Sequence, residues 1–140
     1  MPTRTSSAVW EGALKTGKGT YKIGTGAVGS GAYNFGSRFE EGAGTNPEEL
    51  VAAAHAGCFA MKLSFVLGAA GFTPDSLKAT CTINLSPEKG AITNSHLVLK
   101  AKVPGISKEK FDECVEDARA NCPISKLLNA EITVDSELHS

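Results

Sequence analysis

The sequence of 140 residues predicts an α+β fold. Three features predict this class: an N-terminal part that alternates like strands, a long and almost wholly apolar helix in the middle, and later strands and helices without a regular βαβ rhythm. The length fits a single domain spanning residues 1–140. We expect the central helix to be buried and packed against sheets that are rich in antiparallel strands.

The N-terminal third is predicted to form short strands joined by turns. The expected elements are a strand over residues 8–14 with Trp10, Gly12 and Leu14 on one face, a turn at 16–19, a returning strand at 20–25, a glycine-rich stretch at 24–31, a short apolar piece at 32–35 and a polar loop at 36–44.

The central helix has clear start and stop signals. Asn46 suits the N-cap, Pro47 the first turn, and Glu49 the position that completes a capping box, while Gly71 followed by Pro74 ends the helix. The helix is apolar nearly all round and therefore requires cover on every side. One small domain can hardly supply that cover, so we expect a homodimer in which a second chain helps to enclose the helix.

The C-terminal half is predicted to alternate between strands and helices. The expected elements are a half-buried strand at 77–86, a strand at 97–103, a helix from Ser107 with Phe111, Cys114, Val115 and Ala118 on its inner face, a break at 121–124, a short helix to about residue 129 and a final strand at 132–138.

Charge and composition argue against several classes of function. The formal net charge is −1 and basic and acidic residues are interspersed, so nucleic acid and anionic membrane surfaces are poor candidates as partners. No secretory signal is expected at the N-terminus, and charged residues and His55 interrupt the apolar helix before it reaches the ~18 apolar residues of a membrane span. We expect a soluble, cytoplasmic protein.

The four cysteines are not equivalent. No Cys-x-x-Cys pair occurs, and Cys81 and Cys114 fall on apolar faces, where cysteine acts as a small hydrophobic residue. Cys122 lies before Pro123 and can cap a helix, beside free N–H groups that favour a thiolate. Cys58 lies in mid-helix, where burial keeps a thiol inert unless a neighbour stabilises the negative charge.

Three side chains could stabilise a Cys58 thiolate. His55 and Lys62 lie within one helical turn of Cys58, and Arg38 arrives from the preceding loop. Each also has a plain alternative: a hydrogen-bonded histidine, a solvated lysine, and an arginine paired on the surface with Glu40 or Glu41.

Glu48 precedes Cys58 by ten residues, which places the two ~15 Å apart along one helix. Within that helix they cannot share a site. If two copies of the helix pack antiparallel about a twofold axis, Glu48 of one chain can approach Cys58 of the other.

Four strings resemble the OsmC/Ohr family of osmotically inducible and organic hydroperoxide resistance proteins. They are residues 45–50 (TNPEEL), 53–59 (AAHAGCF), 71–74 (GFTP) and 120–125 (ANCPIS). The loop at 35–39 (FGSRF) together with His55 resembles the OsmC branch more than the Ohr branch. The resemblance implies an intertwined homodimer with two active sites at its interface, and no metal or organic cofactor. It also implies that Cys58 is the peroxidatic cysteine, Cys122 the resolving cysteine, and Arg38 and Glu48 the pair that activates the first thiol.

The implied reaction is the reduction of organic hydroperoxides, and less efficiently of hydrogen peroxide, to alcohols or water. It proceeds through a Cys58 sulfenic acid and an intramolecular disulfide with Cys122, which an external dithiol, such as that of a lipoylated protein, must reduce. An apolar lining would favour alkyl hydroperoxides. Its candidate residues are Phe35, Phe39, Val51, Phe59, Ile124 and Leu127.

Two other classes of function compete with this interpretation. Cys58, His55 and Cys122 could bind zinc as three N/S ligands with an open position, although they lack the usual spaced ligand pairs. The chain could also be a non-catalytic dimeric stress protein with buried thiols, which would consume no peroxide.

Overall fold

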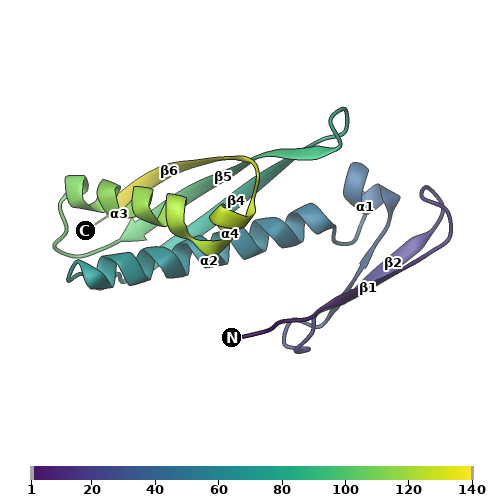
Figure 1. The fold of residues 1–140 in the computed structure, drawn as a ribbon, viewed down its shortest axis with the longest axis horizontal. Coiled ribbons are helices and arrows are strands. Elements are labelled where there is room, and N and C mark those ends of the chain that lie inside the picture. Colours follow the sequence, from purple (N-terminus) through teal and green to yellow (C-terminus); the bar gives the residue numbers. More distant parts are fainter. Residues whose placement is uncertain (1, 140) are drawn as a thin grey trace. The chain divides into compact units, whose positions relative to one another are not determined.

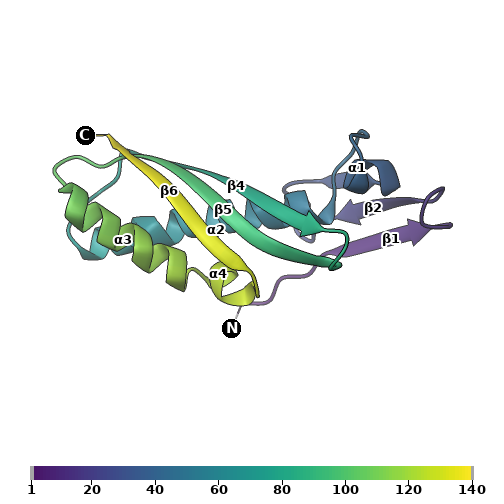
Figure 2. The same ribbon diagram turned by 90° about the horizontal axis from the view of Figure 1, so that it is seen from above.

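The computed structural model describes residues 2–139 and confirms the α+β class, with two sheets and a long helix (Figures 1 and 2). The chain divides into two compact units, which meet in sequence between Leu50 and Val51. The elements are β1 (Ser7–Glu11), β2 (Lys18–Lys22), β3 (Ser30–Tyr33), α1 (Phe35–Phe39), α2 (Pro47–Ala69), β4 (Ser76–Ser86), β5 (Ala91–Lys102), α3 (Lys108–Asn121), α4 (Pro123–Leu127) and β6 (Glu131–His139).

The N-terminal unit is built on an antiparallel sheet in the order β1-β2-β3. Trp10 of β1 pairs with Gly19 of β2, which pairs in turn with Tyr33 of β3. Gly19 is required there, because a Cβ at this position would lie 2.5 Å from the Tyr33 ring. The first strand was predicted to continue to Leu14, but it ends at Glu11, because Gly12 turns the chain with a φ of +100°.

The predicted polar loop at 36–44 is wrong in its first part, where the structure has the short helix α1. Asn34 caps this helix: its Oδ1 accepts from the Ser37 N–H at 2.8 Å, and the Ser37 hydroxyl oxygen accepts from the Asn34 N–H at 2.8 Å. This reciprocal pair satisfies backbone donors that a helix start leaves open. Local capping therefore forms a helix where the apolar pattern gave no signal.

The C-terminal unit holds the hydrophobic core, on one face of the sheet β4-β5-β6. β4 and β5 are antiparallel, whereas β5 and β6 are parallel. Helices α2 and α3 lie side by side on the same face of this sheet (Figure 2). Most of the fully buried side chains come from α2, β5 and α3, and they include Phe59, Leu63, Leu67, Leu97, Leu99 and Phe111.

Helix α2 begins and ends close to the predicted residues. The Asn46 side chain accepts from the Glu49 N–H at 2.7 Å, whereas the Glu49 carboxylate accepts from the Thr45 hydroxyl instead of completing the capping box. At the other end, Gly71 has a φ of +92°, and the Phe72 N–H donates to the Leu67 carbonyl at 2.9 Å. This pattern is a Schellman motif, which only a residue tolerant of positive φ closes without strain.

The outward face of α2 is apolar and uncovered in the single chain. Met61 and Phe65, one turn apart, are 77% and 69% exposed. Contrary to the expectation from its interrupting charges, the helix is long and apolar enough on average to cross a membrane, a test that core helices of soluble proteins also pass. Its opposite face carries Phe59, Leu63 and Leu67 into the core, which identifies α2 as a core helix.

Candidate active site

The two cysteines singled out from the sequence lie next to each other in the C-terminal unit. Cys58 is half-buried on α2, Cys122 is fully buried between α3 and α4, and both are free thiols. Burial raises the pKa of the Cys58 thiol, and the adjacent Cys122 raises it further by charge and hydrogen bonding, while a hydrogen bond from the Ile124 backbone opposes the shift. Residues 64 positions apart in sequence thus share one thiol site.

Cys122 occupies the junction of two helices, as predicted. Its N–H donates to the Ala118 carbonyl at 3.0 Å and ends α3, while its Sγ accepts from the Ser125 N–H at 3.4 Å and caps α4. Pro123, the first residue of α4, has the fixed φ that a helix start favours. The junction holds the sulfur in one place beside backbone N–H groups.

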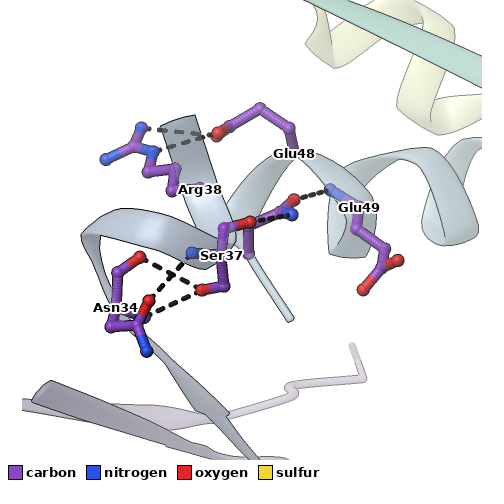
Figure 3. A network of polar contacts seen from close by, with 6 residues as sticks. Asn34, Ser37, Arg38, Glu48 and Glu49 are labelled. Carbon is purple, nitrogen blue, oxygen red and sulfur yellow. Dashed lines mark hydrogen bonds and ion pairs between the residues drawn. The ribbon is translucent and has the colours of Figure 1, made fainter. Parts of the chain in front are cut away.

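Arg38 and Glu48 form a bidentate ion pair within the N-terminal unit (Figure 3). Arg38 Nε donates to Glu48 Oε1 at 2.9 Å and its Nη2 to Glu48 Oε2 at 3.3 Å. The partner of Arg38 is therefore Glu48, not Glu40 or Glu41. A planar fork bound at two points fixes the direction of the guanidinium more firmly than a lysine ammonium could be fixed.

The polar contacts beneath this pair explain its placement. Arg38 lies on α1, which the Asn34 and Ser37 capping pair starts, and Glu48 lies in the first turn of α2. The Asn46 amide joins these two elements, because its Nδ2 donates to the Ser37 carbonyl at 2.9 Å while its Oδ1 caps α2. Arg38 and Glu48 are thus aligned by hydrogen bonds within one unit.

A cavity of about 210 Å³ lies beside Arg38 in the N-terminal unit, lined by Trp10, Leu14, Tyr33, Asn34, Phe35, Arg38 and Phe39. Two of the predicted apolar lining residues, Phe35 and Phe39, belong to it. Phe59 does not, because it is fully buried in the core of the other unit; the prediction that it lines a pocket is wrong. An apolar hollow bordered by a guanidinium suits a ligand with an apolar body and a polar oxygen end.

His55 is hydrogen-bonded, which confirms the plain alternative given for it, but the extended buried chain of hydrogen bonds to which it belongs was not predicted. The Nε2 of His55 lies 2.8 Å from Ser125 Oγ, and its Nδ1 lies 2.6 Å from Ser95 Oγ. Ser125 Oγ is 3.0 Å from Cys122 Sγ, and Ser95 Oγ is 3.1 Å from Cys81 Sγ. The groups that shift the Cys58 pKa are Cys122, Ile124 and, most weakly, Lys62, so His55 bears on the second thiol and not on the first.

Cys114 and Cys81 differ in their surroundings. Cys114 is buried in the core, as predicted, and burial raises its thiol pKa. Cys81 is half-buried on the inward face of β4, where burial raises its pKa and the Ser95 hydroxyl opposes the shift. Both thiols are thereby held protonated at neutral pH.

The alternative of a zinc site finds no support in the geometry. Within residues 2–139 no group of three or more His, Cys, Asp and Glu side chains is arranged to hold a metal ion. Both ring nitrogens of His55 face serine hydroxyls, whereas a zinc ligand needs a free ring nitrogen directed at the metal.

Comparison with known proteins identifies the class. A family model described as OsmC-like protein matches residues 40–137. The chain is 46% identical over 135 residues to the peroxiredoxin OsmC of Escherichia coli, covering 95% of this chain and 94% of that protein. The fold matches an OsmC-like protein of Mycoplasma pneumoniae, with a TM-score of 0.76, 16% identity and 99% of both chains covered. It also matches the organic hydroperoxide resistance protein OhrB of Bacillus subtilis, with a TM-score of 0.63, 23% identity and coverage of 96% and 98%.

The chain therefore belongs to the OsmC-like family. The predicted resemblance to OsmC and Ohr proteins is confirmed.

Proposed function

We propose that Cys58 and Cys122 carry the peroxidase reaction of this chain, a cysteine-based, thiol-dependent hydroperoxide peroxidase of the OsmC family. The Cys58 thiolate attacks the peroxide O–O bond, releasing an alcohol or water and leaving a sulfenic acid on Cys58. Cys122 then condenses with that sulfenic acid to a disulfide and releases water. The observation that carries the proposal is that Cys58 packs against the core cluster that contains Cys122, close enough for Cys122 to raise the Cys58 pKa.

The first step requires a cation near Cys58, because burial raises the pKa of this thiol and the nearby Lys62 ammonium offsets only a small part of the shift. We assign this role to Arg38, whose charge is permanent and whose direction Glu48 fixes at two points. The guanidinium would also stabilise the charge on the leaving oxygen. The apolar cavity beside Arg38 supports a preference for alkyl hydroperoxides over hydrogen peroxide.

The proposed assembly is an intertwined homodimer of single OsmC-like domains, each spanning residues 1–140. The exposed Met61 and Phe65 support it, because contiguous apolar surface on a soluble protein marks an interaction site. An antiparallel pair of α2 helices would bring Arg38, held by Glu48 of one chain, to Cys58 of the partner. The proposed location is the cytoplasm.

The catalytic cycle closes when an external dithiol reduces the disulfide. Thiol–disulfide exchange by a dithiol passes through a mixed disulfide, which the second thiol of the reductant resolves. We propose a lipoylated protein or a small dithiol as this partner. No metal or organic cofactor takes part.

The test compares hydroperoxide consumption by wild type, Cys58→Ser and Cys122→Ser in the presence of a dithiol, with Cys114→Ser as the matched control for loss of a buried thiol. We expect no activity for Cys58→Ser and wild-type activity for Cys114→Ser. Cys122→Ser should turn over once and then accumulate added oxygen mass on Cys58. Equal activity in all four proteins would refute the two-thiol mechanism and favour a non-catalytic role.

A further inference from the structure

The buried chain of side chains from Cys122 to Cys81 has no role in the reaction as described so far. It runs Cys122, Ser125, His55, Ser95 and Cys81, with successive separations of 3.0, 2.8, 2.6 and 3.1 Å. Its three central members are buried, and within residues 2–139 no buried side-chain nitrogen or oxygen lacks a hydrogen-bond partner. Polar side chains in a core destabilise it unless they are all paired.

We propose that Ser125 and His55 form a proton relay that takes the proton from Cys122 when this thiol attacks the sulfenic acid on Cys58. The inference rests on the proposed two-cysteine function and adds positioning residues for its second step. The attack of Cys122 on the sulfenic acid needs a proton acceptor, because the nucleophile is a thiolate and not a thiol. Cys122 is fully buried, so bulk solvent has little access to its proton.

The donors and acceptors along the chain fit this role. A neutral imidazole has one N–H and one acceptor nitrogen. Burial lowers the pKa of His55, which keeps the ring neutral and able to accept a proton at neutral pH. If Nδ1 carries the hydrogen and donates to Ser95 Oγ, then Nε2 accepts from the Ser125 hydroxyl, whose oxygen is free to accept the proton of Cys122.

Ser95 and Cys81 fix that tautomer. The Ser95 oxygen accepts from Nδ1, and its hydroxyl then donates to Cys81 Sγ, so every hydroxyl in the chain points toward Cys81. A hydrogen-bond partner on one ring nitrogen fixes the imidazole tautomer and thereby directs the other ring nitrogen, as the base, toward the nucleophile. The titratable groups around the chain are the thiols of Cys58, Cys81 and Cys122, with the Lys62 ammonium acting on Cys58.

The step balances as follows. The Cys122 proton passes to Ser125 Oγ as the Ser125 hydroxyl proton passes to His55 Nε2. The Cys122 thiolate, which then accepts hydrogen bonds from the Ser125 hydroxyl and N–H, attacks the Cys58 sulfur; the S–S bond forms, the S–O bond breaks and hydroxide leaves. The imidazolium proton returns through Ser125 to the hydroxide and yields water, while the oxidising equivalents are those that the peroxide gave to Cys58.

The experiment separates the two steps in a single turnover of the full chain with one equivalent of tert-butyl hydroperoxide. Peroxide loss reports sulfenic acid formation, and quenching followed by mass spectrometry reports the conversion of added oxygen mass on Cys58 into the Cys58–Cys122 disulfide. The variants are Ser125→Ala, Ser125→Thr and His55→Gln, which keeps a hydrogen-bonding amide but cannot take a proton. The control is His96→Gln. It removes a histidine that is paired to Thr133 and Asp135 and does not belong to the hydrogen-bonded chain from Cys122 to Cys81.

We expect peroxide loss to be unchanged in every variant. Disulfide formation at neutral pH should slow by a factor on the order of 10² in Ser125→Ala and His55→Gln, the lower end of what a general base contributes. The rate should recover in Ser125→Thr and remain normal in His96→Gln. The defect of the relay variants should shrink as the pH rises, because hydroxide that enters the site when it opens locally can replace the missing base.

Unchanged disulfide formation in both relay variants would overturn the relay, as would slowing that is equal at all pH values or that affects both steps alike, since both indicate loss of packing only. If His55→Gln fails to fold, the pair of Ser125 variants decides the question. A wild-type protein that consumes peroxide without forming the disulfide would refute the proposed function itself, independently of the relay.

Discussion

Replacing Phe65 with alanine should strongly weaken the proposed dimer without unfolding the chain. Phe65 is 69% exposed in the single chain, so of the ~200 Å² of an aromatic side chain about 140 Å² is open to a partner. At ~25 cal/mol per Å² its burial contributes roughly 3.5 kcal/mol for each chain, or about 7 kcal/mol for both copies at a twofold interface. Alanine would keep the smaller part of this buried apolar area, so the expected loss of dimerisation free energy is about 4 kcal/mol, which raises Kd on the order of 10³-fold.

Analytical ultracentrifugation from nanomolar to micromolar concentration measures this change, with circular dichroism to verify that the helices remain. Phe65→Leu should keep most of the affinity, since it keeps most of the apolar area and loses only the ring beneath the Lys62 ammonium, 5.1 Å away. Val98→Ala is the control, because Val98 is exposed on β5 and not on α2. A wild-type chain that sediments as a monomer throughout, or a Phe65→Ala dimer as stable as wild type, would refute the reasoning.

Three further predictions concern the site and the core. Arg38→Ala should slow peroxide loss in a single turnover by roughly 10- to 10³-fold at neutral pH and much less at alkaline pH, where the Cys58 thiolate forms unaided; a pH-independent defect would place Arg38 on the peroxide instead. Leu99→Ala, in the fully buried centre of β5, should lower the free energy of unfolding by about 2–5 kcal/mol in urea titrations, and an unchanged midpoint would contradict the assigned core. Burial lowers the pKa of His55, so as the pH falls the unfolded protein binds a proton at this histidine before the folded protein does. The stability that this group contributes should therefore be complete above the ordinary histidine pKa of ~6.5, and below it the free energy of unfolding should fall by at most ~1.4 kcal/mol per pH unit. Urea titrations across pH would measure this slope, which His55→Gln should reduce.

The long elements could be predicted from sequence because their signals are local. Helix α2 has a capping asparagine, a proline in its first turn and a glycine just past its end, and β4 alternates throughout. Helix α1 was missed because five residues are too few for an apolar period, and its capping pair lies among glycines. The parallel pairing of β5 with β6 could not be predicted, because it is a long-range contact without a signal in either strand.

The candidate site was only partly accessible from the residues themselves. The roles of Cys58 and Cys122 came from the family resemblance, since spacing does not report a contact between residues so distant in sequence. The sequence pattern does contain an indication of the buried hydrogen-bonded chain through His55. Ser95 stands in phase with the buried Leu97 and Leu99, and His55 stands one helical turn before the buried Phe59. Polar residues at positions where the period requires apolar ones indicate a buried network.

The parallel pairing of the last strand has a consequence for how the protein is made. β6 runs beside β5 from Glu131 to His139, so one flank of the C-terminal sheet is supplied by a strand that is synthesised after every other element of this unit. Its inward Ile132, Val134 and Leu138 pack against the core, which cannot close during synthesis until they emerge. A nascent or truncated chain lacking this strand would keep a bare edge and an open apolar face, so quality control should remove it before it could gain any activity.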